Sequence, residues 1–153
     1  MTAAGWLGKA AREGHKYAQY SLGGLYYRGN GVEQSYETAF SLYRSSAGQG
    51  NAYASYELGK MHRDGIGTDV DRDQSEEAFR NAFSGFTEMA KKQPDDKLHY
   101  RLGQMARDGM GTEANLESAA AYFELAAEAG NANGQYALAQ LYLKHSDKPA
   151  KIR

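Results

Sequence analysis

The residues most able to do chemistry are four histidines and a row of aspartates, together with three Gly-x-Gly motifs whose backbone could bind a phosphate. His15, His62, His99 and His145 lie far apart, and none has a second histidine four residues away, the spacing that places two metal ligands on one helix face. The chain has no cysteine to act as a thiolate nucleophile or soft metal ligand. No nucleophile, base and orienting group can be named, so we predict a non-enzymatic protein with no metal site and no cofactor.

The aspartates Asp69, Asp71 and Asp73 have the spacing that begins a calcium-binding loop. Gln74 stands where that loop needs glycine, and Arg80 stands where it needs a closing glutamate. Because coordination would be incomplete, we predict a solvent-exposed loop and helix caps here instead.

The Gly-x-Gly elements are Gly29-Asn30-Gly31, Gly65-Ile66-Gly67 and Gly109-Met110-Gly111. A dinucleotide-binding loop follows a strand and opens a helix with a third glycine. Each element here follows a helical pattern, so we predict turns, in which glycine accepts left-handed backbone angles at low cost.

Composition limits the partners. The 153 residues carry a formal charge of −1, which gives no global attraction to nucleic acid or anionic membranes. No run approaches the about 18 apolar residues that span a bilayer, and the first residues lack the pattern of a signal peptide. We therefore expect a cytoplasmic protein without membrane insertion.

The glycines recur with a fixed stride. Leu22-Gly23 returns as Leu58-Gly59 after 36 residues and as Leu102-Gly103 after another 44, and Leu138-Ala139 follows 36 residues later. Each unit has the pattern of two helices. In the first full unit the core stripe of the first helix is Ala18, Leu22, Leu25 and Tyr26, and that of the second is Ala39, Tyr43, Ser46 and Ala47.

Two residues of this unit have special roles. Gly23 lies beside the stripe, where a missing side chain lets a neighbouring helix approach closely, and Ser35 is the expected N-cap of the second helix.

The middle unit is eight residues longer than the others. Its second helix aligns best through Ala82, Phe86 and Ala90, which places seven of the extra residues around Asp69–Ser75 and one near Pro94. We therefore expect a longer loop and a longer second helix. We expect Asp73 and Glu76 to form a capping box there.

The chain is therefore predicted to be one all-α array of eight helices. Its parts are the second helix of an incomplete unit (1–14), a repeat (15–50), a long repeat (51–94), a repeat (95–130), and a final first helix with a tail (131–153). Both ends interrupt a unit, so we expect a piece of a longer array. Trp6, Leu138 and Leu141 are expected to be uncovered there and to permit weak self-association.

The motifs Ala18-x-x-x-Leu22-Gly23-x-x-Tyr26-x-x-Gly29-x-Gly31-Val32 and Ala39-x-x-Leu42-Tyr43-x-x-Ser46-Ala47-x-x-Gly50 resemble those of the Sel-one-like repeat family, relatives of the tetratricopeptide repeats. The resemblance covers nearly the whole chain. It implies an α-α superhelix, or solenoid, of helix hairpins that acts as an adaptor in complexes and signalling.

A narrower likeness concerns the order of a 36-residue unit, a 44-residue unit and then Tyr100-Arg101-Leu102-Gly103-Gln104-Met105. It is similar to repeat regions appended to relaxases of conjugative elements in Gram-positive bacteria. That likeness implies an alternative function, as a nucleic-acid or relaxosome-associated accessory region of a bacterial DNA-mobilisation protein.

In such arrays the first helix of each pair lines the concave face, which directs attention to the side of each first helix opposite its core stripe. The candidate partner-binding residues on that side are Tyr17, Tyr20, Tyr27, Tyr53, Tyr56, Lys60, Arg63, Lys97, Tyr100, Gln104, Arg107, Tyr136 and Gln140. Tyrosine and arginine surfaces are typical of binding hot spots, and an acidic peptide would suit them.

The four aligned tyrosines Tyr20, Tyr56, Tyr100 and Tyr136 leave two interpretations open. They either contact a partner or pack between neighbouring helices as part of the fold. We predict a scaffold for a protein or peptide, with nucleic acid reached only through a parent protein or complex.

Overall fold

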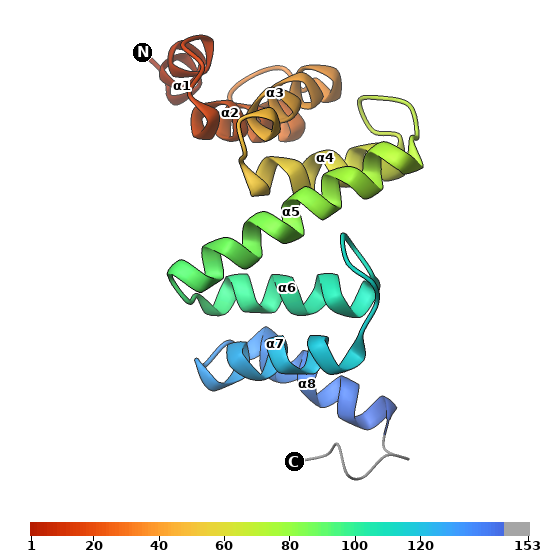
Figure 1. Ribbon diagram of the computed structural model, residues 1–153. Helices are drawn as coiled ribbons and strands as arrows, with labels where there is room; N and C mark the ends of the chain where they lie inside the picture. Colours follow the sequence, from red (N-terminus) through yellow and green to blue (C-terminus); the bar gives the residue numbers. More distant parts are fainter. Residues whose placement is uncertain (146–153) are drawn as a thin grey trace. The chain divides into compact units, whose positions relative to one another are not determined.

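A computed structural model describes residues 1–145, and within that range the chain consists of helices joined by turns and loops, without a strand (Figure 1). Its eight helices are α1 (Ala3–Arg12), α2 (Lys16–Arg28), α3 (Tyr36–Gly48), α4 (Ala52–Asp64), α5 (Arg72–Lys92), α6 (Asp96–Asp108), α7 (Leu116–Glu128) and α8 (Ala132–Lys144). The all-α class and the succession of helix hairpins predicted from the sequence are confirmed.

The chain divides into two compact units. The first covers Met1–Gly85 and contains α1 to α4 with the first part of α5. The second starts at Phe86 and contains the rest of α5 with α6, α7 and α8. The boundary lies inside α5, and each unit has its own buried cluster, around Tyr43 and Met61 in the first and around Phe123 in the second.

Capping residues set the helix bounds at the predicted places. The Ser35 Oγ atom accepts the Thr38 backbone N–H at 3.1 Å, so Ser35 is the N-cap of α3. At the other end of the first helices, Gly29, Gly65 and Gly109 adopt left-handed backbone angles, with φ of 69°, 69° and 72°. The Gly-x-Gly elements are therefore turns that end helices, as the sequence indicates.

One kind of contact joins the two helices of each complete hairpin: a glycine of the first helix faces an aromatic ring of the second. A Cβ atom added at the glycine would lie far inside contact distance of the ring, at 2.9 Å for Gly23 and Tyr43, 2.7 Å for Gly59 and Phe79, and 2.5 Å for Gly103 and Phe123. The two helices can approach this closely only because glycine carries hydrogen there.

The register predicted for α5 is wrong. Phe79, and not Phe86, packs on the glycine of its hairpin, and α5 begins at Arg72, 36 residues after Tyr36 begins α3. No residues are inserted in the loop before it. The extra residues all extend the helix, whose 21 residues compare with 13 in α3. Phe86 is buried in the second unit, where the Arg101 guanidinium lies 5.2 Å from its ring centroid.

The expected capping box at Asp73 and Glu76 is also wrong. Asp71 directly precedes α5, and its Oδ1 atom accepts the Gln74 backbone N–H at 3.0 Å, which is the geometry of an N-cap. The same three-residue spacing joins Ser35 to Thr38.

Of the residues expected to be uncovered at the two ends, Trp6 has 59% of its surface exposed and Leu138 is half-buried. The expectation for Leu141 is wrong. Only 8% of its surface is exposed, because its side chain packs in a cluster with Ala119 and Phe123 of α7.

The glycine contacts predict a specific effect on stability. Gly103→Ala places a methyl group against the Phe123 ring, and overpacking of this kind lowers the free energy of unfolding by about 1–3 kcal/mol. Gly48→Ala is the matched control, because its Cβ would meet no atom within 4 Å and alanine favours helix, so the free energy should hold or rise by up to about 1 kcal/mol. Urea unfolding measures both, and equal effects of the two changes would contradict the close approach.

Candidate partner-binding surface

The four aligned tyrosines, named here the tyrosine column (Tyr20, Tyr56, Tyr100 and Tyr136), lie one turn before the glycine position of each first helix. In the complete hairpins the ring of each column tyrosine contacts the aromatic residue that packs against the glycine. The centroid distances are 5.7 Å from Tyr20 to Tyr43, 5.6 Å from Tyr56 to Phe79, and 5.8 Å from Tyr100 to Phe123. These three tyrosines are half-buried, so they pack between helices and still present part of each ring to solvent.

In the first unit, cations flank this aromatic pair. The Lys60 ammonium lies 5.1 Å from the Tyr56 ring centroid, and the Arg63 guanidinium lies 5.9 Å from that of Phe79. Such cation–π contacts contribute about 0.5–1 kcal/mol at exposed sites and restrict where the long side chains can go. Lys60, Tyr56 and Arg63 thus form one row along α4.

The second unit repeats the arrangement with one change. The Arg107 guanidinium lies 5.8 Å from the Phe123 ring centroid, as Arg63 does from Phe79. Gln104 takes the place of lysine, and its Nε2 atom donates to the Tyr100 hydroxyl at 3.2 Å. Two repeats therefore build the same row on different helices.

The arginines of these rows are charge-compensated. Arg63 donates from Nε and Nη2 to the two carboxylate oxygens of Asp64, at 2.9 and 3.0 Å, and Arg107 donates likewise to Asp108 at 2.9 and 3.1 Å. These hydrogen bonds raise the pKa of both guanidinium groups, and the one from Arg63 lowers the pKa of Asp64.

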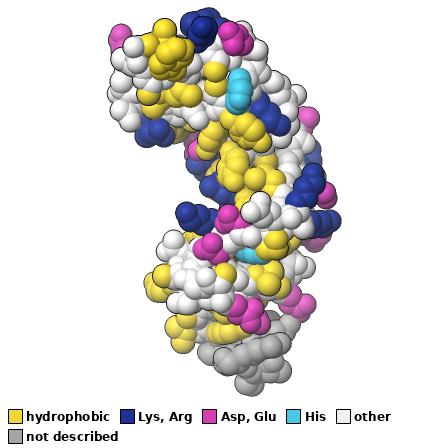
Figure 2. Space-filling view, turned by 90° about the vertical axis from the view of Figure 1, so that its left-hand side faces the viewer, with side chains coloured by type: hydrophobic (Ala, Val, Ile, Leu, Met, Phe, Trp, Pro, Cys, Tyr) yellow, Lys and Arg dark blue, Asp and Glu magenta, His cyan; other side chains and the backbone are white. Residues whose placement is uncertain are grey.

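Lys60 is compensated in the same way, since its Nζ atom lies 2.9 Å from a carboxylate oxygen of Glu57. On the face of the molecule drawn in Figure 2, basic and acidic side chains lie next to each other. The surface therefore carries both positive and negative charges and is not a continuous basic patch.

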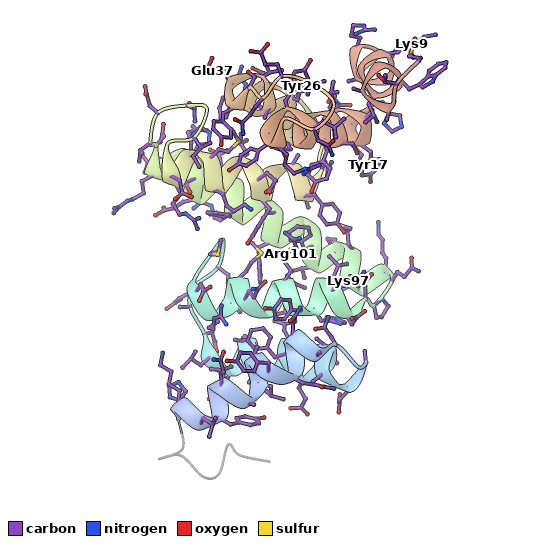
Figure 3. The ribbon with its side chains drawn as sticks, turned by 180° about the vertical axis from the view of Figure 1, so that it is seen from behind. Lys9, Tyr17, Tyr26, Glu37, Lys97 and Arg101 are labelled. Carbon is purple, nitrogen blue, oxygen red and sulfur yellow. The ribbon has the colours of Figure 1, made fainter. Side chains whose placement is uncertain are left out.

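The remaining candidate residues lie on the first helices of the hairpins and on α8, and they differ in exposure to solvent. Tyr17 and Lys97 are exposed in the first turns of α2 and α6 (Figure 3). Tyr53 is half-buried with its ring centroid 5.9 Å from that of Tyr20, while Tyr136 is exposed and accepts a hydrogen bond from Gln140 Nε2 at 3.1 Å.

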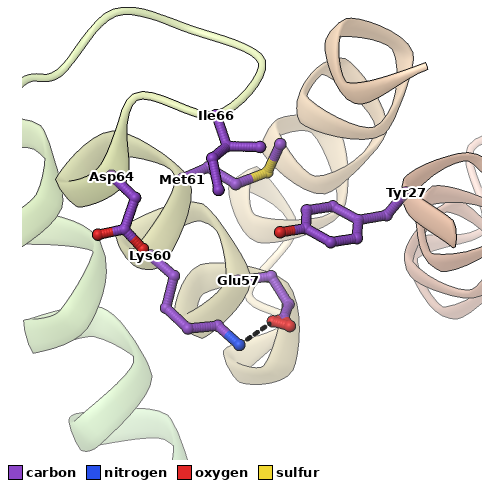
Figure 4. A pocket seen from close by; sticks show the side chains of 6 residues that line it. All are labelled: Tyr27, Glu57, Lys60, Met61, Asp64 and Ile66. Atoms are coloured by element: carbon purple, nitrogen blue, oxygen red, sulfur yellow. Dashed lines mark ion pairs between the residues drawn. The ribbon is translucent and has the colours of Figure 1, made fainter.

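Tyr27 and Lys60 meet at a cavity of about 230 Å³ in the first unit (Figure 4). Its lining is Tyr27, Glu57, Lys60, Met61, Asp64 and Ile66. Four of these six residues, Glu57, Met61, Asp64 and Ile66, were not predicted from the sequence, because each has the pattern of an ordinary core or surface residue of its own repeat. The repeated Arg-Asp-Gly of 63–65 and 107–109 is the signal that could have identified the two compensating aspartates.

Residues 1–145 contain no group of three or more histidine, aspartate or glutamate side chains placed to hold a metal ion. Among the same residues, no helix has the length and apolar character needed to cross a membrane.

His62 is a buried histidine with an unusual environment. Its ring lies edge-on to that of Phe40, with 5.2 Å between the centroids, and its Nδ1 atom has no hydrogen-bond partner among residues 1–145. Burial lowers the pKa of His62, the Arg44 charge acts in the same direction, and Asp71 opposes them. The equivalent positions hold Tyr26, Ala106 and Tyr142, so His62 occupies a position that two other repeats fill with tyrosine.

Comparison with known proteins identifies a repeat family. The model of the Sel1 repeat matches residues 2–15, 16–51, 52–80 and 97–131. No curated protein matches.

Two solved structures are similar over 92% of this chain. One is a Sel1 repeat protein from Oxalobacter formigenes, with 28% identity and a TM-score of 0.64. The other is a protective antigen present in uropathogenic Escherichia coli strains, which displays an SLR fold, with 32% identity and a TM-score of 0.64. The chain spans 54% of the length of the first and 28% of the second.

The environment of His62 predicts a pH effect on stability. Because the folded chain holds this histidine neutral more strongly than the unfolded chain does, the unfolded state binds more protons below about pH 6.5, and stability falls as the pH falls. His62→Tyr, the residue of the equivalent positions 26 and 142, should remove this contribution, which cannot exceed about 1.4 kcal/mol per pH unit. Urea unfolding at pH 7.5 and 5.5 measures it, and identical losses in both proteins would refute the assignment.

Proposed function

We propose that this chain, which belongs to the Sel1 repeat family, is a non-enzymatic scaffold that binds a peptide or protein on the exposed side of its first helices. Sel1 repeat proteins are generally protein–protein interaction scaffolds. The observation that carries the proposal for this chain is the row of tyrosine, lysine or glutamine, and arginine that two separate hairpins build alike.

The side chains of the rows are preorganised for binding. Each row tyrosine and arginine is already held against a buried aromatic ring, so these side chains would lose little conformational entropy when a partner contacts them. A guanidinium has five N–H donors, and the hydrogen bonds to Asp64 or Asp108 use two of them. Three donors on each arginine are left for acceptors of a partner.

Charge compensation favours a protein partner over nucleic acid. Lys60, Arg63 and Arg107 each have a neighbouring carboxylate, so they offer hydrogen bonds and ring surface more than net positive charge. Binding to a phosphate backbone depends on uncompensated cations that release counterions. The DNA-mobilisation alternative would therefore need further residues outside these rows.

The proposal predicts that loss of both row arginines weakens peptide binding. Peptides selected from a displayed random library on the wild-type chain should bind the Arg63→Ala, Arg107→Ala double variant at least about tenfold more weakly, the usual scale for a hot-spot arginine. Isothermal titration measures the affinities. The matched control is the Arg80→Ala, Lys91→Ala double variant. It removes two exposed cations of α5, which is the second helix of its hairpin, and it should keep the wild-type affinity.

Two outcomes would count against the proposal. One is equal affinity of the arginine variant and the control for every selected peptide. The other is failure to select peptides together with binding of a DNA oligonucleotide that weakens steeply with salt, which would favour the nucleic-acid alternative.

A further inference from the structure

Arg28, the last residue of α2, differs from the arginines of the rows in its charge environment. The residue that follows the row arginine is Asp64 in α4 and Asp108 in α6, and each aspartate pairs with that arginine. The equivalent position of α2 holds Arg28 itself, which follows Tyr27, so the sign of the charge is reversed. The first helix of the first complete hairpin thus carries a cation where the next two hairpins carry a carboxylate.

The Arg28 side chain folds back along its helix over Gly24. A Cβ atom built at Gly24 would lie 3.2 and 3.4 Å from the two Nη atoms of Arg28. The positions equivalent to Gly24 hold larger polar residues, namely Lys60, Gln104 and Gln140. Because glycine has no side chain, the guanidinium takes the space beside the helix where those side chains begin.

Tyrosines surround this guanidinium. Tyr20 and Tyr27 lie one turn before and one turn after Gly24 on the same side of α2, so the guanidinium lies between the two tyrosine positions. Burial raises the pKa of the Tyr43 hydroxyl, and the Arg28 charge acts in the opposite direction, which means that the cation lies near Tyr43 as well. Arg28 therefore belongs to the same aromatic surface as the tyrosine column.

In the described part of the chain, Arg28 has no carboxylate partner. No aspartate or glutamate oxygen lies within 4.0 Å of its guanidinium, and no other protein group forms a hydrogen bond with it there. The nearby carboxylates are already paired, Glu57 with Lys60 and Asp64 with Arg63, both at 2.9 Å. All five N–H donors of Arg28 are thus available, and a guanidinium in this state can bind a carboxylate through two parallel hydrogen bonds.

We propose that Arg28 binds the carboxylate of an aspartate or glutamate side chain of the bound peptide. The inference rests on the proposed function and names one residue class of the partner. Arg63 and Arg107 offer hydrogen bonds with little net charge, because each is paired with an aspartate, whereas Arg28 supplies a full positive charge. An acidic residue of the partner therefore gains most at α2, and Arg28 determines which peptides are preferred.

The test compares peptide selections. Displayed random peptides are selected in parallel on the wild-type chain, on Arg28→Gln and on Arg44→Gln. Arg44 is the matched control, because it is exposed on α3, lies 5.4 Å from the Phe40 ring centroid and pairs with no carboxylate among the described residues. Peptides from the wild type and from Arg44→Gln should share an aspartate or glutamate at one position, and those from Arg28→Gln should lack that preference.

Affinities test the same contact directly. Replacing the shared acidic residue of a selected peptide by its amide should weaken binding to the wild type about fivefold or more and leave binding to Arg28→Gln unchanged, as expected for a direct pair. Gly24→Gln introduces the residue of the equivalent positions 104 and 140 and displaces the guanidinium without removing its charge. It should weaken binding of the acidic peptide more than that of the amide peptide. Isothermal titration measures each affinity.

Three results would overturn the proposal while the scaffold function stands, since peptides would have been selected. They are the absence of an acidic preference in the wild-type peptides, the same preference on Arg28→Gln, and an equal loss on both proteins when the acidic residue is replaced. If no peptide is selected on any of the three chains, the scaffold function fails and the assignment of Arg28 fails with it.

Discussion

The contact between a glycine of the first helix and an aromatic ring of the second helix is the constraint on which the rest of each hairpin depends. Gly23 with Tyr43, Gly59 with Phe79 and Gly103 with Phe123 all join residues 20 positions apart, although the repeat that holds the second pair is longer than the others. The eight additional residues extend α5 beyond the contact and leave the hairpin itself unchanged. The extra length of this repeat thus lies at the far end of the second helix, where the glycine contact is not disturbed.

The same ring also builds the surface. Phe79 and Phe123 each pack on a glycine with one part of the ring, support a column tyrosine at 5.6 or 5.8 Å, and lie beneath an arginine. The residues of the exposed rows therefore pack directly on the rings of the glycine contact, which restricts their movement. The glycine and aromatic residues that recur in the three complete hairpins serve this contact.

The fold could be predicted from the sequence because glycine, alanine and aromatic residues recur at a stride that only stacked helix hairpins explain. The register of α5 could not, since Phe79 and Phe86 both follow helical spacing and both are buried, one against α4 and the other in the second unit. The candidate rows were found because their residues repeat. The cavity was missed because its walls come from two consecutive repeats, so that no single repeat contains its pattern.

The glycine contact can be observed directly by nuclear Overhauser effects between glycine Hα protons and the ring protons of selectively labelled phenylalanine and tyrosine. We predict cross-peaks from Gly23 to Tyr43, from Gly59 to Phe79 and from Gly103 to Phe123, with the Hα signals displaced by the ring currents. Cross-peaks from Gly59 to Phe86 in place of Phe79, or no cross-peak from any of the three glycines to a ring, would contradict it.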